Sequence, residues 1–587
     1  MQHRPPRRLL SCRRIPMGVA LVLTGILAAC SGGAASNTSG GGGGGGNGTQ
    51  TSTDMGSIVN VNSTTLFSYQ DQLKNAASGM VLGVSGQSQT AGTPIVQEAN
   101  AGSTDSMWHL VPNVYADERI NIENMLTHQV IGLSTTESSV GLPSSASMNA
   151  GAQALQFSDT GTDDEDWVLY KLTDGNYLIK NHYSGLYLQD EGSNATSSAI
   201  IDQGTRSATV TGCQCQEWTL TATTAKAYPM PLTVQGTGVF VHDPNMIQDQ
   251  NHVYWLYGTH QTIAYSTDLS TFTYTTGTSA DGACGATQAS DAWLTQDGRC
   301  ADIGPDFASW KGLQTPPSDN GGLNTDVWAP DVLYANNAYY QYYAIPVEPD
   351  PGASCPSTDS ACQGGEAIIG LATSPSPSGP WTDQGWVERS WSNTSTPISG
   401  FGFVNTTKDN AIDPAPYIDA AGNWWLVYGS WFDGTHIVQL DSSSGLPSAT
   451  NTQRYAAGFR YWGEEGSFIY PYVVNGTQYY YYFASINPCC SATSTYRIVV
   501  GRSTSPTGPF LDRGGQDMES NGGTILLSTH DNIVGPGGQS VFTDTGTNGS
   551  ASQPTLVYHY YDGNNNGTPT LGINRLGFTS DGWPYVQ

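Results

Sequence analysis

Residues 410–431 read NAIDPAPYIDAAGNWWLVYGSW and combine an acid, a turn and an aromatic strand in one short stretch. Asp413 stands before a proline, residues 419–423 are typical of a tight turn, and residues 424–428 favour a strand. An aromatic run bounded by turn residues predicts a β-hairpin. We therefore expect this stretch to form one hairpin with a carboxylate just ahead of it.

Four more aromatic runs of this kind lie in the C-terminal part of the chain, at residues 253–257, 339–343, 479–483 and 556–560. Each run is bounded by Gly, Asn or Asp. Short antiparallel sheets that are repeated five times favour a propeller over a sandwich. We therefore predict a five-bladed β-propeller over residues 230–587.

A different repeat precedes the propeller. Its three units share one spacing: Leu73-Lys74-Asn75 with Ser78 and Leu82, Ile122-Glu123-Asn124 with Thr127 and Ile131, and Ile179-Lys180-Asn181 with Ser184 and Leu188. A tryptophan closes each unit, at Trp108, Trp167 and Trp218. Such units cannot bury a hydrophobic face alone, so we expect residues 60–223 to pack around a threefold axis.

Residues 60–223 resemble the ricin B-type lectin β-trefoil, and Gln216-Glu217-Trp218 matches that family's Gln-x-Trp motif. The resemblance implies sugar binding, which the family supports with an Asp after the Leu of each repeat. Gly83, Gly132 and Gln189 occupy those positions here. The alternative is a trefoil that only spaces or stabilises the rest of the chain.

The first residues have the layout of a signal peptide, with five arginines followed by an apolar run from Met17 to Ala29. Leu27-Ala28-Ala29-Cys30 resembles the bacterial lipoprotein signal, which implies cleavage before Cys30 and acylation of its thiol. Residues 1–30 are thus the expected signal peptide, and the Gly/Ser-rich residues 31–59 are an expected flexible linker. The chain would be secreted and anchored by lipid to the cell envelope.

The composition narrows the class of partner. The chain has 587 residues, a net charge of −28, 70 glycines and 31 tyrosines, and only 12% of its residues are charged. Abundant Gly and Tyr favour an all-β protein. A strongly negative chain is a poor partner for nucleic acid, so we expect a neutral polysaccharide substrate and a monomer.

Eight cysteines follow Cys30, and an even number in an oxidising compartment predicts disulfides. Proximity in sequence suggests two pairs, Cys284 with Cys300 and Cys355 with Cys362. Cys213 with Cys215, and Cys489 with Cys490, would close very small rings. Metal binding is the alternative for these two pairs, although no histidine cluster accompanies them.

Acids stand ahead of four of the aromatic strands, in Val241-His242-Asp243-Pro244, Trp328-Ala329-Pro330-Asp331, Ala411-Ile412-Asp413-Pro414 and Glu464-Glu465-Gly466. Carboxylates at the inner strands of different blades are expected to converge on the propeller axis. Hydrolysis of a glycosidic bond needs two such groups, one to protonate the leaving oxygen and one to activate water or attack directly. A third carboxylate can tune the pKa of the acid.

Residues 232–587 resemble glycoside hydrolase family forty-three, and within it the arabinan endo-1,5-α-L-arabinosidases. The matching stretches are His242-Asp243-Pro244, Val327-Trp328-Ala329-Pro330-Asp331, Asn410-Ala411-Ile412-Asp413-Pro414, Tyr428-Gly429-Ser430-Trp431, Cys489-Cys490 with Ser494-Thr495-Tyr496-Arg497-Ile498, Gly535-Pro536-Gly537 and Tyr558-His559-Tyr560-Tyr561. The resemblance implies hydrolysis of α-1,5-linked L-arabinan with inversion. It makes Asp243 the general base, Asp413 the pKa modulator and Glu465 the general acid, with Glu464 as the competitor for the last role.

The resemblance also suggests substrate contacts. Trp328 and Trp431 are expected to stack on sugar rings, with blade packing as the alternative. Asn410 and His559 are the other expected substrate-binding residues. The expected chemistry requires no cofactor. Calcium near the propeller axis is the alternative, against which Gly538 stands where many endo-acting relatives carry a histidine that helps to hold the ion.

Two rival functions remain open at this stage. One is an exo-acting α-L-arabinofuranosidase or β-xylosidase on the same propeller, and the other is a noncatalytic carbohydrate-binding lipoprotein. Because all three acids lie in the propeller, deletion of residues 60–223 is expected to leave hydrolysis of soluble oligosaccharides nearly intact.

Overall fold

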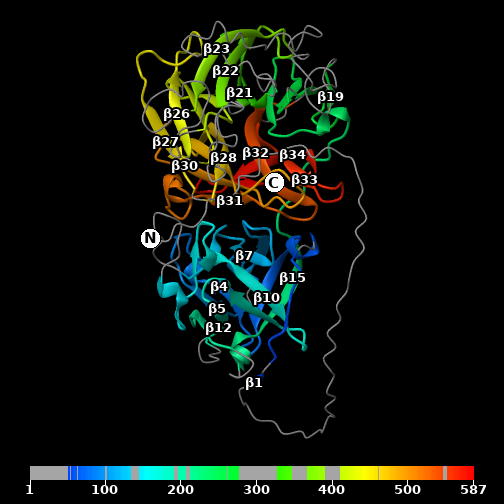
Figure 1. The fold of residues 1–587 in the computed structure, drawn as a ribbon, viewed down its shortest axis with the longest axis vertical. Coiled ribbons are helices and arrows are strands. Elements are labelled where there is room, and N and C mark those ends of the chain that lie inside the picture. Colours follow the sequence, from blue (N-terminus) through cyan, green and yellow to red (C-terminus); the bar gives the residue numbers. More distant parts are fainter. Residues whose placement is uncertain are drawn as a thin grey trace, which may run out of the picture.

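The computed structural model describes residues 51–52, 54–61, 64–99, 102–133, 145–190, 196–206, 212–260, 262–275, 327–346, 367–390, 410–431, 433–460, 462–546 and 552–587. Within these ranges the chain forms strands and short 3-10 turns, which agrees with the predicted all-β class. The strands form two bodies, one above the other (Figure 1). None of the helices in the described ranges has the length and apolar character needed to span a bilayer.

The N-terminal body is a β-trefoil. Its barrel closes because β15 pairs with both β11 and β3. The six barrel strands are β3 (Tyr69–Asn75), β6 (Trp108–Pro112), β7 (Arg119–Asn124), β10 (Trp167–Lys171), β11 (Tyr177–Asn181) and β15 (Trp218–Lys226). Three hairpins complete the sheet: β4 (Val81–Val84) with β5 (Ile95–Glu98), β8 (Val130–Gly132) with β9 (Leu155–Phe157), and β12 (Tyr187–Asp190) with β13 (Ile201–Gly204).

Three short strands lie outside this scheme. Strand β2 (Ser57–Ile58) pairs with β10, and β1 (Thr51–Ser52) pairs with β14 (Gly212–Cys213). They add to the edges of the trefoil without changing its barrel.

The sequence repeat has a direct structural cause. The three closing tryptophans are fully buried, and each indole N–H donates to the carbonyl of the repeat's aliphatic residue, at Leu82, Ile131 and Leu188. The Asn of each unit caps its own turn, as Asn75 does by accepting from the N–H groups of Ala77 and Ser78. A buried indole needs a partner, so the repeat spacing is fixed by hydrogen bonding as well as by packing.

The C-terminal body is a propeller of five four-stranded antiparallel sheets, as predicted. The inner strands are β16 (Asn245–Gln248), β20 (Trp328–Ala335), β24 (Ala415–Ile418), β28 (Glu464–Val474) and β32 (Ile533–Asp544). Each inner strand contacts its two neighbours, which closes the ring. The five aromatic runs form the second strands, β17 (Tyr254–Gly258), β21 (Ala338–Pro346), β25 (Trp424–Gly429), β29 (Thr477–Ile486) and β33 (Gln553–Asp562).

The outer half of each blade consists of two further strands. The third strands are β18 (Thr262–Ser266), β22 (Ala367–Ser374), β26 (Thr435–Leu440), β30 (Arg497–Ser503) and β34 (Thr568–Phe578). The fourth strands are β19 (Thr273–Tyr274), β23 (Thr382–Arg389), β27 (Arg454–Gly458), β31 (Thr524–Leu527) and β35 (Pro584–Val586).

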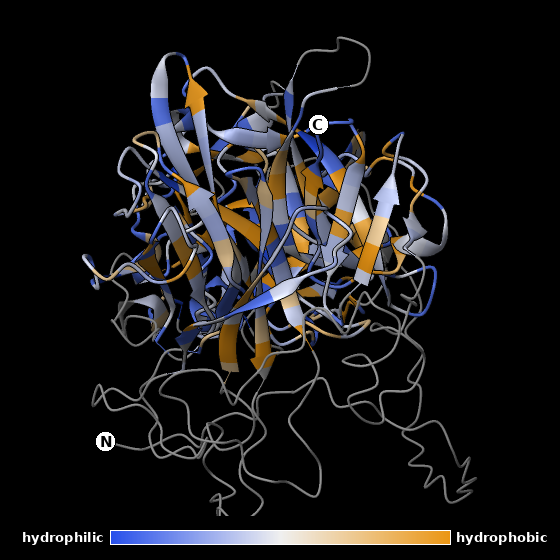
Figure 2. Cartoon of the chain, turned by 90° about the horizontal axis from the view of Figure 1, so that it is seen from above, coloured by the Kyte–Doolittle hydropathy of each residue, from blue (hydrophilic) through white to orange (hydrophobic). Residues whose placement is uncertain are grey.

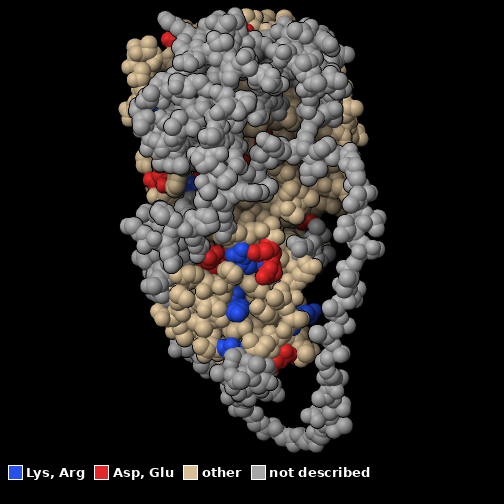
Figure 3. Space-filling model, viewed as in Figure 1, with Lys and Arg blue, Asp and Glu red and all other residues tan. Residues whose placement is uncertain are grey.

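Hydrophobic residues gather inside the blades rather than on the surface. The second strands carry fully buried tyrosines, among them Tyr428, Tyr482 and Tyr558. Apolar bands cross the strands in the middle of the molecule (Figure 2). The visible surface of the described part carries only a few small groups of charged side chains (Figure 3), in keeping with the low charged fraction.

Two disulfides lie in the described residues, Cys213–Cys215 and Cys489–Cys490. These pairs are therefore cross-linked, and metal binding by their thiolates is not the correct alternative. The other predicted features, namely acylated Cys30, the linker and the pairs of Cys284 with Cys300 and Cys355 with Cys362, lie outside the described residues.

Candidate active site

One backbone feature recurs in all five blades at the start of the regular pairing of the inner strand. A residue with left-handed φ stands two places before the residue that pairs with the second strand: Asp243 (49°), Ala329 (40°), Asp413 (53°), Gly466 (61°) and Gly538 (56°). The pairing begins at Asn245 and Ala415 in two blades, and it resumes after a register shift at Asp331, Phe468 and Ser540 in the other three. The five blades therefore present one equivalent position to the axis, and two of them fill it with a carboxylate.

This register corrects one expectation from the sequence. Asp331 is not equivalent to Asp243 and Asp413, because Ala329 occupies that position in its blade. Asp331 follows the proline instead of preceding it, pairs with Tyr342 and is buried. Asp331 therefore belongs to the blade interior, where burial raises its pKa well above the usual value.

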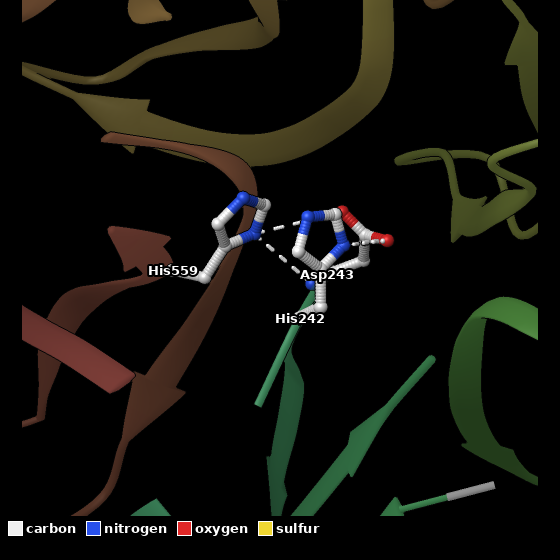
Figure 4. Close-up of side chains that lie close together, drawn as sticks. All are labelled: His242, Asp243 and His559. Carbon is white, nitrogen blue, oxygen red and sulfur yellow. Dashed lines mark hydrogen bonds and ion pairs between the residues drawn. The ribbon is translucent and has the colours of Figure 1, made fainter. Parts of the chain in front are cut away.

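Asp243 is held on several sides. Its Oδ2 accepts from Thr259 Oγ1 and lies 2.7 Å from both that oxygen and His242 Nδ1. Its backbone N–H donates to His559 Nδ1 at 3.0 Å. Figure 4 shows the two imidazole rings beside the carboxylate, stacked with centroids 3.8 Å apart. Thr259 in turn accepts from the N–H of Ala329 at 2.9 Å, and this bond links the blade of β16 to the blade of β20.

The hydrogen positions in this network follow from its backbone donors. Because the N–H of Asp243 donates to His559 Nδ1, that ring is neutral with its proton on Nε2, 3.1 Å from the Tyr561 hydroxyl. The Tyr561 oxygen also accepts from the N–H of Cys490 at 2.8 Å. Its own proton is left for His242 Nε2, at 2.8 Å. His242 therefore carries its proton on Nδ1 and donates it to Asp243.

Glu465 is the second residue of β28. Its Oε2 accepts from Ser430 Oγ and from Trp431 Nε1, both at 3.0 Å. Its neighbour Glu464 points to the other side of the strand, as alternation requires, and is 1% exposed. The carboxyl of Glu464 accepts from the Tyr482 hydroxyl inside the blade. Of the two competing glutamates, Glu465 is thus the one that faces Trp431 and the axis.

The three carboxyl groups have opposed acidities. Burial alone would raise the pKa of Asp243, but the electrostatic effect of the two imidazole rings and the hydrogen bonds from His242 and Thr259 lower it well below its usual range. Burial and the negative charge of Asp243 raise the pKa of Glu465 to about 7. Burial and the charges of Glu465 and Asp243 also raise the pKa of Asp413. The ionised Asp243 thus shares the site with Glu465 and Asp413, which hold their protons more tightly. This difference is typical of a site that contains both a base and an acid.

Asp413 is tied to the same strand as Glu465. Its Oδ2 accepts from the N–H of Gly466 at 2.9 Å. Because Gly466 directly follows Glu465, this bond fixes the backbone at the acid. The electrostatic coupling of Asp413 to both Asp243 and Glu465 brings the three predicted catalytic residues into one site.

The four predicted substrate-binding residues have different surroundings. Trp328 is partly buried and packs against Ala344 and Ile412. Trp431 is also partly buried and donates to Glu465. His559 is fully buried beneath His242. Asn410 is 6% exposed, and its Oδ1 has no hydrogen-bond partner among the described residues.

His242, Asp243 and His559 are the described residues that lie closest to a metal-binding arrangement, with ligand atoms within 4.8 Å of one another. Calcium prefers six to eight oxygen ligands, whereas this group offers two imidazoles and one carboxylate. The imidazole nitrogens are already engaged by Asp243 and Tyr561. A Cβ at Gly538 would lie 2.5 Å from Asp243 Oδ1, so this arrangement also has no room for a histidine there. The group does not fit calcium.

Three contributing residues were not singled out from the sequence. Ser430 and Tyr561 lie inside motifs that were recognised, but strand direction was needed to assign them to Glu465 and the two histidines. Thr259 lies in no recognised motif, and only the fold brings it to Asp243.

Comparisons with known proteins identify the family. The model of Glycosyl hydrolases family 43 matches residues 304–584, and that of the ricin-type β-trefoil lectin domain-like family matches residues 66–143. The chain is 38% identical over 278 residues to extracellular endo-α-(1→5)-L-arabinanase 1 of Bacillus subtilis (strain 168), covering 47% of this chain and 72% of that protein. It is 35% identical over 277 residues to arabinan endo-1,5-α-L-arabinosidase A of Aspergillus niger, covering 45% and 74%.

The chain is also similar to a solved structure. The family 43 endo-arabinanase from Bacillus licheniformis is 30% identical, with a TM-score of 0.43, and the match covers 60% of this chain and 99% of that one. The propeller, its opposed carboxyl groups and the similarity to most of a curated relative agree, and the chain belongs to glycosyl hydrolase family 43 and is a glycoside hydrolase.

Proposed function

We propose that this protein is an extracellular enzyme that hydrolyses α-1,5-linked L-arabinan with inversion. In this proposal Asp243 is the general base, Glu465 is the general acid and Asp413 modulates and orients Glu465. The relatives from Bacillus subtilis and Aspergillus niger are named for action on this polymer, which supports the substrate assignment. The low charged fraction suits a neutral polysaccharide.

The proposed reaction uses one ionised carboxylate, Asp243, and one protonated carboxyl group, Glu465. Asp243, ionised and held by His242 and Thr259, removes a proton from a water molecule that attacks the anomeric carbon. Glu465, protonated below a pH of about 7, donates its proton to the leaving O5 of the next sugar. Serine and indole donors keep the Glu465 carboxyl in one orientation. The single observation that carries the proposal is the opposite direction of the Asp243 and Glu465 pKa shifts.

Product analysis tests the substrate and the mode of cleavage. Debranched arabinan would be incubated with the enzyme and with Asp243→Ala, and the lengths of the products would be followed over time. A ladder of intermediate oligosaccharides is the expected result, with turnover about 10²- to 10⁴-fold lower in the variant. Release of one sugar at a time would favour an exo-acting enzyme, and absence of any product would refute arabinan as the substrate.

We also propose a lipid anchor at Cys30, from the Leu27-Ala28-Ala29-Cys30 pattern alone. Cys30→Ser is expected to move the protein from the membrane fraction to the soluble fraction of the producing cells. An unchanged membrane distribution would contradict the anchor without affecting the catalytic proposal.

A further inference from the structure

The trefoil and the propeller share a buried polar interface. Arg497, on β30 of the propeller, pairs with Asp159 of the trefoil at 2.6 Å, and both side chains are 1% exposed. The same guanidinium donates to Asn121 Oδ1 at 3.2 Å and to the carbonyl of Pro112. A buried guanidinium requires such partners, and here the trefoil supplies them.

A second arginine connects this interface to the strand that carries the acid. Arg460 is 2% exposed, and its guanidinium donates to the carbonyl of Asp159 in the trefoil and to those of Asn521 and Gly522 in the propeller. The carbonyl of Arg460 accepts from the N–H of Gly463 at 3.1 Å. Both ends of Arg460 thus fix the segment that leads into β28.

Trp462 is held by the trefoil from two sides. Its ring meets Tyr115 edge to face, with centroids 5.8 Å apart. It also lies against the backbone of Gly161, where a Cβ would come within 2.6 Å of Trp462 Cδ1. Tyr115 is itself fixed by Arg119, whose Cζ lies 3.7 Å from the ring centroid. Three trefoil residues therefore determine where this propeller indole can lie.

The contacts continue from Trp462 to the acid. Gly463 has a left-handed φ of 106° and packs against the ring of Trp431. A Cβ at Gly463 would lie only 2.5 Å from the nearest atoms of that ring. The N–H of Trp431 donates to the carbonyl of Glu464 at 2.8 Å, and its indole donates to Glu465 Oε2. A shift of Trp462 would move Gly463, then Trp431 and then the carboxyl of Glu465.

We propose that the trefoil is a positioning element of the catalytic site, and that Tyr115 acts through Trp462 to hold the carboxyl of Glu465. The inference rests on the proposed role of Glu465 as the acid. It replaces the expectation that the trefoil is dispensable for short soluble substrates. Tyr115 touches no reacting group, so it is a positioning residue.

The test compares Tyr115→Ala with a matched control, Tyr177→Ala. Tyr177 is another partly buried trefoil tyrosine, and its strand pairs with Trp218 of the trefoil. On linear arabino-oligosaccharides, Tyr115→Ala is expected to lower kcat about tenfold with little change in KM, a part of the 10²- to 10⁴-fold contribution of a general acid. Tyr115→Phe, which keeps the ring, should restore kcat, and Tyr177→Ala should leave it unchanged. Thermal unfolding would verify that all variants are folded.

A double-variant measurement separates this inference from the proposed function. In the Glu465→Gln background, Tyr115→Ala should cause no further loss, because the group that it positions is already absent. An additive loss, a change in KM alone, or an equal loss in Tyr177→Ala would overturn the positioning role. Wild-type kcat in Tyr115→Ala beside an inactive Glu465→Gln would overturn the inference and leave the acid assignment intact. Full activity of Glu465→Gln would overturn both.

Discussion

Tyr561 sets the protonation pattern around the proposed base. Its hydroxyl oxygen accepts from Cys490 and His559, and its proton goes to His242. A positively charged His242 would present a third donor to the Tyr561 oxygen, so the hydrogen-bond network favours a neutral His242 ring. The charge of Asp243 acts against this, because it raises the pKa of His242. The consequence is a base whose supporting histidine can donate only through Nδ1.

Tyr561→Phe is therefore expected to lower kcat/KM about 10- to 100-fold, because small misplacements of a catalytic group have effects of that size. The variant leaves the Cys490 N–H and two imidazole nitrogens without their common partner. Tyr560→Phe is the matched control, since Tyr560 lies on the same strand and packs in the hydrophobic core. Kinetics on linear arabino-oligosaccharides would measure both variants. Equal losses in both would remove the proposed role of Tyr561.

The activity of the wild-type protein should fall as the pH rises above about 7. The pKa of Glu465 is raised to about 7, so the carboxyl is protonated and competent below that pH and loses its proton above it. The pKa of Glu464 is raised to about 7 as well, so the pH profile alone does not distinguish the two. Glu465→Gln should lose the basic limb of kcat/KM, whereas Glu464→Gln should keep it. The reverse pattern would show that the acid is misassigned.

At the scale of elements, β28 places two glutamates in different environments through simple alternation. Glu465 faces Ser430 and Trp431, whereas Glu464 is enclosed in the blade with Tyr482. Burial raises the pKa of Glu464, and its Oε2 has no partner among the described residues. A buried carboxyl with one unpartnered oxygen makes the strand sensitive to pH without taking part in catalysis.

Glu464→Gln should make stability less dependent on pH. A folded-state pKa of about 7 lies above the unfolded value, so the stability that Glu464 contributes is complete at pH 4 and is lost as the pH rises through 7. The total loss corresponds to about 3 kcal/mol. Denaturant unfolding at pH 5 and pH 8 should show a smaller difference in the variant than in the wild type. The exposed Glu118→Gln should behave as the wild type, and if Glu464→Gln does so too, the assignment is wrong.

The fold was predictable from the sequence where local patterns repeat. The spacing of Asn75 and Trp108 recurs because each repeat closes the same hydrogen bonds, and the aromatic runs recur because each blade needs a buried second strand. The prediction for Asp331 was wrong because the sequence pattern was an acid near a proline. In the structure the equivalent position is the residue that precedes the proline, and in this blade that residue is Ala329. The contact of Tyr115 with Trp462 joins two domains, so no sequence pattern could reveal it. Thr259 reaches Asp243 across the open end of a single hairpin, β16–β17, and was missed because it lies in no recognised motif.

At the scale of the whole molecule, the trefoil and the propeller are joined by packed side chains as well as by the chain that connects them. Val130 of the trefoil belongs to a hydrophobic cluster that is otherwise built mainly from the propeller. Among the described residues, two ion pairs cross the boundary. Arg497–Asp159 is buried, whereas the Lys226 side chain of the pair with Asp531 is 41% exposed. Burial should decide which of them stabilises the protein.

Asp159→Ala is expected to destabilise the protein by about 3 to 5 kcal/mol, because it leaves the buried guanidinium of Arg497 without its counter-charge. Lys226→Ala should cost less than about 1 kcal/mol, as exposed pairs do. Denaturant unfolding would compare the two variants at one pH and salt concentration. A similar small cost for both would mean that the domain boundary is not a buried interface in solution.

The most direct test of the catalytic account is the configuration of the first product. Linear α-1,5-arabino-oligosaccharide would be mixed with the enzyme, and the anomeric proton signals of the new reducing end would be followed by NMR before mutarotation. A base at Asp243 that activates water opposite a leaving group protonated by Glu465 predicts that the β-anomer appears first. If the α-anomer appears first, the reaction proceeds with retention, and the assignment of Asp243 as a base acting on water is contradicted.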